Sequence, residues 1–108
     1  INGFHALVRE VPAMDGKALK EIVSTLKGQD DQMVILLISN NDGRLTLVAG
    51  AGKEAVKRGV HAGNLVKAAA LTTEGKGGGK PDLAQAGGSN AAKINEALNQ
   101  ALQTIETL

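Results

Sequence analysis

The segment Gly75-Lys76-Gly77-Gly78-Gly79 is the feature that most limits how this chain can fold. Glycine loses more conformational freedom on folding than any other residue, so we predict an irregular loop here and neither a helix nor a strand. Consecutive glycines expose backbone N–H groups and let an anion approach closely, and neighbouring lysines add positive charge. A triple glycine alone is nevertheless more typical of a flexible connector.

The residues after the glycines favour phosphate binding over a connector. Pro81 restricts the direction of the chain, and the small residues of 84–88 permit close backbone packing beneath a loop. A flexible linker needs neither feature. We therefore predict a phosphate-binding site made by Lys76, Gly77, Gly78, Gly79 and Lys80, with supporting contacts from Lys53, Lys57, Arg58, Lys67 and Gln85.

The patterns on either side of this segment predict alternating strands and helices. The first half indicates a strand over 3–11, a helix over 15–27 that Asp15 caps and Gly28 ends, and a hairpin with strands over 33–38 and 44–49. The second half indicates a looser stretch over 50–59, a helix over 62–73, an ambiguous segment over 83–86, and a helix from about 91 capped by Asn90 or Ser89.

This order predicts one α/β domain with a mixed β-sheet, about three helices and a glycine-rich loop before the last helix. The hairpin requires an antiparallel pair of strands, whereas the first helix allows a parallel crossover. The length of 108 residues suits one hydrophobic core, so we expect a single domain over 1–108. The chain begins with Ile1 and not with Met, so we also expect a piece of a longer protein.

Positive charge is concentrated in the middle of the chain, although the net charge is only +1. Residues 53–80 hold six Lys and Arg against two Glu, whereas residues 1–52 hold five basic and six acidic residues. This basic middle leads into the glycine segment and indicates a surface for a polyanion. A uniformly solvated surface is the alternative explanation.

Composition excludes several classes of function. The single aromatic residue, Phe4, argues against nucleic-acid binding through stacked bases, so contacts should go to phosphates and sugars. Cysteine is absent, which excludes disulfides and thiolate metal sites and fits a reducing cytoplasm. No apolar run is long enough to span a bilayer, and we expect no membrane partner.

The other glycine motifs lack the context that their chemistry needs. The segment Gly50-Ala51-Gly52-Lys53-Glu54-Ala55 fits a loose dinucleotide fingerprint, but it follows the second arm of a hairpin and no helix is predicted to open on it. The Gly-Lys pairs at 52–53 and 79–80 are followed by Glu54 and Pro81, unlike a P-loop. Nucleotide binding and hydrolysis are therefore not expected.

Catalytic groups are scarce. His5 and His61 have no metal-ligand spacing; His5 is interpreted as a surface or hydrogen-bonded residue, and His61 as a charge beside a basic helix. The carboxylates of Asp30, Asp31 and Asp42 fall in expected turns, and the serines at 24, 39 and 89 have no nearby base. We expect neither a catalytic residue nor a metal site.

Residues 77–88, Gly-Gly-Gly-Lys-Pro-Asp-Leu-Ala-Gln-Ala-Gly-Gly, resemble the glycine-rich signature near the C-terminus of alanyl-tRNA synthetases. That family has Lys or Arg at the position of Lys80, followed by Pro, Asp, an aliphatic residue, Ala and Gln. Residues 62–66 resemble the family's helix entry, where Asp is more usual than Asn64, and residues 47–50 fit its strand end. The resemblance covers roughly residues 30–108.

The resemblance implies a C-terminal domain of the DHH-associated type, the C-Ala domain, that binds tRNA at the outer corner of its L shape. Alanine tRNA and other domains of the same chain are the implied partners. The full-length protein would be a cytoplasmic alanine–tRNA ligase whose ATP, magnesium and zinc belong to its aminoacylation and editing modules. No motif of those modules occurs here, so the fragment itself is expected to hold no cofactor and to catalyse nothing.

Two alternatives stay open. The same domain type accompanies DHH phosphoesterases and grips substrate phosphate there, but a His usually follows their glycine run where this chain has Lys80. The second alternative is a homodimerisation module. It would use the apolar stripe of the last helix, although packing of this stripe on the domain's own sheet is the favoured interpretation: Ile94, Ala97, Leu98, Ala101, Leu102, Ile105 and Leu108.

Overall fold

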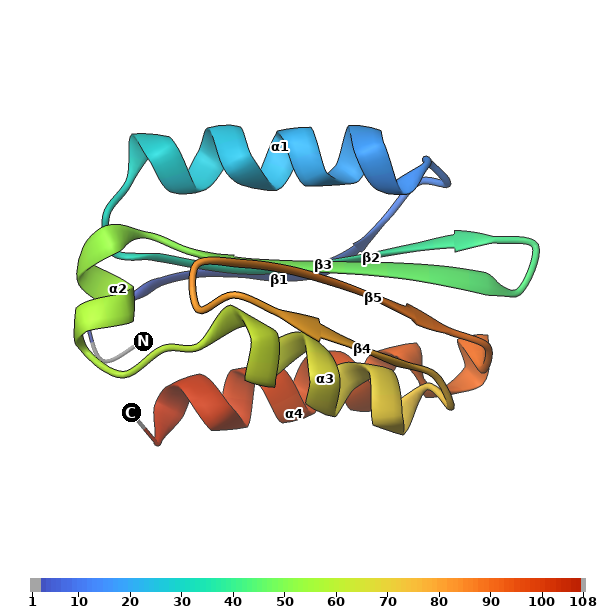
Figure 1. Ribbon diagram of the computed structural model, residues 1–108. Coiled ribbons are helices and arrows are strands. Elements are labelled where there is room, and N and C mark those ends of the chain that lie inside the picture. Colours follow the sequence, from blue (N-terminus) through green and yellow to red (C-terminus); the bar gives the residue numbers. More distant parts are fainter. Residues whose placement is uncertain (1–2, 108) are drawn as a thin grey trace.

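The computed structural model describes residues 3–107 as three layers, with α1 on one face of a sheet and α3 and α4 on the other (Figure 1). Within that range no helix is both long and apolar enough to cross a bilayer. In chain order the elements are β1 (His5–Val11), α1 (Gly16–Gln29), β2 (Met33–Asn41), β3 (Arg44–Ala51), α2 (Lys53–Lys57), α3 (Ala62–Thr72), β4 (Lys76–Gly79), β5 (Leu83–Gly88), the 3-10 turn η1 (Ala91–Lys93) and α4 (Ile94–Glu106).

The predicted mixed sheet is confirmed. Its strand order is β1-β2-β3-β5-β4, so β1 and β4 form the two edges. The crossover through α1 makes β1 and β2 parallel, and all other neighbours are antiparallel. The sheet thereby places the glycine segment at the edge farthest from β1.

The apolar run of β2 is covered on both faces, as its sequence predicts. Val34, Leu36 and Ile38 belong to the larger core cluster under α3 and α4. Ile35 and Leu37 belong to a smaller cluster that includes Leu19, Val23 and Val48 and lies under α1. Because side chains alternate along a strand, one continuous apolar segment supplies both cores.

The turn signals place the first helix and the hairpin correctly. The side chain of Asp15 caps α1 by accepting from the Ala18 N–H at 2.8 Å. Between β2 and β3, Asp42 and Gly43 have φ values of 54° and 90°, the left-handed conformation that a tight two-residue hairpin requires. Gly28 does not end α1, since the helix continues to Gln29 and Asp30 is its C-cap.

The stretch over 50–59 is more regular than expected. β3 continues to Ala51, and α2 begins directly after Gly52, so the prediction that no helix opens on these glycines is wrong. The carbonyl of Asp31 accepts from the N–H groups of Glu54 and Ala55 at 2.9 and 3.0 Å. Because this carbonyl occupies two amides in the first turn of α2, those two amides are not available to a dinucleotide phosphate.

The glycine segment is a strand and not an irregular loop. β4 pairs antiparallel with β5, and Gly77 and Gly79 lie opposite Ala86 and Ala84. A Cβ on Gly77 would come within 2.3 Å of the Ala86 Cβ. The glycines here allow two backbones to approach closely, and this pairing offsets the entropy that favoured a loop.

The last helix begins one turn later than its periodicity suggests. Asn90 caps η1 through the Ala92 N–H at 3.1 Å, and α4 follows from Ile94. The side chains of Ile94, Ala97, Ala101 and Ile105 are buried in the larger core, so the stripe packs on the domain's own sheet. Leu108 lies outside the described residues.

Candidate nucleic-acid interface

One half of the sheet is open on the side of α1. α1 packs on β2 and β3 and barely reaches β5, whereas α3 covers β3, β5 and β4 on the opposite face. Gln85 pairs with Val48, which lies under α1, and Gly78 and Lys76 share that face through their places on β4. The half of the sheet formed by β5 and β4 therefore carries side chains on the α1 face that α1 does not cover.

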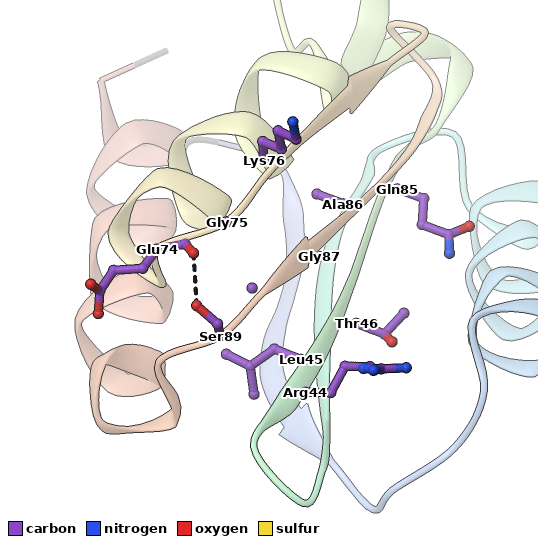
Figure 2. A pocket seen from close by; sticks show the side chains of 11 residues that line it. Arg44, Leu45, Thr46, Glu74, Gly75, Lys76, Gln85, Ala86, Gly87 and Ser89 are labelled. Atoms are coloured by element: carbon purple, nitrogen blue, oxygen red, sulfur yellow. Dashed lines mark hydrogen bonds between the residues drawn. The ribbon is translucent and has the colours of Figure 1, made fainter.

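Three adjoining hollows mark this open surface. The first, of about 650 Å³, is lined by residues that include Arg44, Thr46, Lys76 and Gln85. Figure 2 shows Arg44, Thr46 and Gln85 of this hollow extending from the sheet toward α1. The second hollow, of about 330 Å³, shares Gln85 and lies along the β4–β5 turn.

The third hollow, of about 540 Å³, shares Asp82 with the second and reaches the end of α2. We call the surface formed by the three hollows the basic strip, because seven cationic side chains line it against the three carboxylates of Asp31, Glu74 and Asp82. The seven are Lys20, Lys27, Arg44, Lys53, Lys57, Lys76 and Lys80.

Most of these cations are available to a ligand. Lys27 pairs with Asp82 at 3.2 Å, and Lys57 pairs with Glu54 at 3.5 Å on the same short helix. The other five have no hydrogen-bond or ion-pair partner within residues 3–107: Lys20, Arg44, Lys53, Lys76 and Lys80. An excess of partnerless cations gives the strip a positive potential that attracts polyanions.

The backbone of β4 does not bring the glycine N–H groups together as the predicted phosphate-binding site requires. Successive N–H groups of a strand point to opposite sides, so the amides of Gly77, Gly78 and Gly79 do not converge on one anion. The first amides of α3 are also occupied, since Ala62 and Gly63 donate to the carbonyls of Pro81 and Lys80 at 2.7 and 3.1 Å. On the face of the strip, Gly78 of β4 and Gly87 of β5 instead leave a floor without side chains, and we call it the glycine floor.

An ion pair fixes the β4–β5 turn against α1. Lys27 Nζ donates to Asp82 Oδ2 at 3.2 Å, and this bond lowers the pKa of the Asp82 carboxyl below its ordinary value of 3.8. The charges of Lys27 and Lys80 lower it further, and slight burial opposes them. The carboxylate thus holds Lys27 in place at the junction of the second and third hollows.

We expect Lys27→Met to raise the pKa of Asp82 toward 3.8, as measured by NMR titration of its carboxyl carbon. A depressed folded-state pKa contributes stability that is present above the unfolded value and lost as the pH falls through the folded value. The variant should therefore lose less stability below about pH 4 than the parent. The side chain of Asp82 is 52% exposed, so the difference should stay well below ~1 kcal/mol.

The matched control is Lys57→Met, which removes a charge from the same hollow without touching Asp82. An unchanged Asp82 pKa in Lys27→Met, or an equal shift in both variants, would contradict a specific ion pair.

The structure brings together some predicted contacts and separates others. Lys53, Lys57 and Gln85 line the basic strip with Lys76 and Lys80. Two other predicted contacts lie elsewhere. The guanidinium of Arg58 stacks 4.1 Å over the Phe4 ring and donates to Gln32 at 3.3 Å, and Lys67 lies on the exposed side of α3, which packs on the other face of the sheet.

Three cations of the strip were missed from the sequence. Lys20 and Lys27 are seven residues apart on α1, a spacing that puts them on one side of a helix. Arg44 alternates with Thr46 and Val48 on β3, which puts it on the face of α1. The sequence spacing of these three residues could have predicted the faces on which they lie. No local sequence pattern, however, showed that β4 would lie beside that face of the sheet.

The groups considered for catalysis have structural roles. His5 bonds the carboxylate of Asp30, which also accepts from the Gln32 N–H, and these bonds lower the pKa of Asp30. His61 is the N-cap of α3, where its Nδ1 accepts from the Asn64 N–H at 3.1 Å. This capping role was not predicted from the sequence, which suggested only an electrostatic role. Among residues 3–107, no three His, Asp or Glu side chains are grouped as a metal site.

The sequence matches one family of known domains over nearly its whole length. The model of the family described as the DHHA1 domain matches residues 3–107. The chain belongs to the DHHA1 domain family.

Similar sequences to this DHHA1 domain occur in much longer proteins. The domain is 44% identical over 105 residues to the alanine–tRNA ligase of Oceanobacillus iheyensis, covering 97% of this chain and 12% of that protein. It is 54% identical over 84 residues to the alanine–tRNA ligase of Neisseria meningitidis serogroup C, covering 78% of the chain and 10% of that protein. The chain therefore spans about a tenth of the length of these relatives.

The fold is also similar to a solved structure, the C-Ala domain from Aquifex aeolicus alanyl-tRNA synthetase. The TM-score is 0.82 at 24% sequence identity, covering 90% of this chain and 86% of the other. At this identity the likeness supports the fold alone, and it confirms the α/β arrangement expected from the sequence.

Proposed function

We propose that this DHHA1 domain is the tRNA-binding accessory domain of an alanine–tRNA ligase. In this proposal the basic strip binds tRNA phosphates, and other domains of the full-length protein carry out aminoacylation and editing with their ATP, magnesium and zinc. The observation that carries the proposal is the gathering of seven cations over a glycine floor, five of them without a partner within residues 3–107.

The composition of the strip favours backbone contacts over base recognition. It contains no aromatic ring on which a base could stack. Lys76 begins β4 and Lys80 directly follows its last residue, so the two lie about 13 Å apart if the chain is extended between them. That span lets the two ammonium groups contact different phosphates, with the flat strand between them accommodating the sugar backbone.

The relatives favour this role over the phosphoesterase alternative. The similar proteins named above are alanine–tRNA ligases, and Lys80 occupies the position after the glycines. Dimerisation through α4 stays a prediction, and the burial of Ile94, Ala97, Ala101 and Ile105 within the domain leaves less apolar surface for it.

We expect the 108-residue chain to bind a transcribed alanine tRNA with strong salt dependence. Each phosphate-neutralising contact changes the slope of log K against log salt by about 0.7 to 0.9. If the five partnerless cations all contact phosphate, the slope should approach about −4. Fluorescence anisotropy of labelled tRNA between low and moderate salt measures this slope. No binding at low salt, or a slope flatter than about −1, would contradict the proposed function.

A further inference from the structure

Gln85 is the neutral polar side chain at the centre of the basic strip. It lies in the middle of β5, is exposed, and lines both the first and the second hollow. Figure 2 shows its amide extending from the sheet toward α1. A ligand that follows the strip from one hollow to the other must therefore pass this amide.

The surroundings of Gln85 leave its amide open to a ligand. No hydrogen bond to it occurs within residues 3–107. Its cross-strand neighbour is Gly78, and Gly87 is the next residue of β5 on the same face. At the start of α1 stands Gly16, where a Cβ would come within 2.4 Å of the Gln85 Nε2. Three glycines thus make space around an amide that has a free donor and a free acceptor.

The other groups of the strip cannot distinguish one nucleic acid from another. Lysine and arginine bind phosphate, which RNA and DNA share. The Ser89 hydroxyl is used within the domain, since it donates to the Glu74 carbonyl at 2.8 Å. The Thr46 hydroxyl lies on the same face but belongs to a short, half-buried side chain. Among the residues that line the strip, only Gln85 has a long side chain that can both donate and accept hydrogen bonds.

A ribose 2′-hydroxyl is the partner that suits such a group. It both donates and accepts, and it is the group that lets a protein tell RNA from DNA. RNA helices display their 2′-hydroxyls on a wide, shallow groove, which a flat surface can approach without unstacking bases. We propose that Gln85 bonds a ribose 2′-hydroxyl and so makes the basic strip selective for RNA, an inference that rests on the proposed function.

The test compares two forms of one molecule, a transcribed alanine tRNA and the same transcript with 2′-fluorine in place of every 2′-hydroxyl. Fluorine keeps the RNA-type helix but removes the hydroxyl donor, so shape and charge stay matched. Since a typical net hydrogen bond corresponds to about fivefold in affinity, the parent chain should bind the hydroxyl form about fivefold more tightly. Gln85→Ala should bind both forms equally, with the affinity of the parent for the fluoro form.

Three variants separate this role from general effects. Lys80→Ala should weaken both forms by the same factor and keep their ratio. Gln103→Ala, which removes an exposed amide on α4, should change neither affinity. Gly16→Ala should reduce the ratio because its methyl group displaces the Gln85 amide without removing it. Melting temperatures of the variants verify that each one is folded.

Each outcome decides the inference. Equal binding of the two forms by the parent would overturn it while leaving the proposed function intact, provided that binding depends on salt. An equal loss for both forms in Gln85→Ala would also overturn it and make Gln85 a phosphate contact. No binding of either form by the parent would remove the proposed function itself and the inference with it.

Discussion

Replacing both Lys76 and Lys80 with alanine is expected to weaken tRNA binding about thirtyfold, because each exposed lysine–phosphate contact contributes about 1 kcal/mol. Both side chains are exposed, Lys76 begins β4 and Lys80 directly follows it, and no carboxylate among residues 3–107 forms an ion pair with either lysine. The slope of log K against log salt should also become less steep by about two. Anisotropy titrations of the parent and the double variant at several salt concentrations measure both quantities.

The matched control is Lys67→Ala with Lys93→Ala. This pair removes the same total charge but lies on α3 and η1, away from the three hollows. If the basic strip is the binding surface, the control should keep most of the affinity and the salt slope of the parent. Equal losses in the two double variants would mean that tRNA responds to net charge alone, and would remove the assignment of the site.

The largest effect on stability is expected for Gly75→Ala, at about 2–3 kcal/mol of the free energy of unfolding. A Cβ there would lie 1.9 Å from the carbonyl oxygen of Gly87 and 2.6 Å from the Cα of Gly88. These are backbone atoms, so a side-chain rotation cannot relieve the clash. The Gly75 N–H also donates to the Ala70 carbonyl at 2.7 Å, which holds the residue between α3 and β4.

Urea unfolding followed by circular dichroism measures this loss, and the melting temperature should fall by roughly 15 °C. Gly28→Ala is the control, because nothing lies within 4 Å of a Cβ at that position in the last turn of α1. Alanine favours a helix over glycine, so this variant should gain about 0.5–1 kcal/mol. A Gly75→Ala variant as stable as the parent would show that the β4–β5 pair tolerates wider spacing than the structure has.

The main features of the fold could be predicted from local patterns. The apolar run of β2, the Asp15 cap and the Asp42-Gly43 turn each depend on neighbours in sequence, and each was placed correctly. Predictions from neighbouring residues fail where a contact with a distant segment changes which local conformation is more stable. Gly28 continues a helix despite its entropy cost, and α2 forms where Asp31 of a different segment accepts from its first amides.

The sequence predicted several residues of the candidate site but not how they are arranged in space. Lys76, Lys80, Lys53 and Lys57 were identified from charge and spacing, and they line one strip. Arg58 was grouped with them because it belongs to the basic stretch of residues 53–80. Its stacking on Phe4 depends on the N-terminal segment lying beside α2, and sequence spacing does not contain that contact.

The sequence alone shows that a glycine segment flanked by Lys76 and Lys80 precedes small residues, and that no aromatic ring stands near it. That the segment is an edge strand could be established only from its pairing in the folded chain. Glycine carries no side chain, and a run of glycines therefore has no alternation of apolar and polar residues that could indicate a strand. Its conformation is set by its partners, Ala84 and Ala86 across the ladder and α3 beneath it, which come from other parts of the chain.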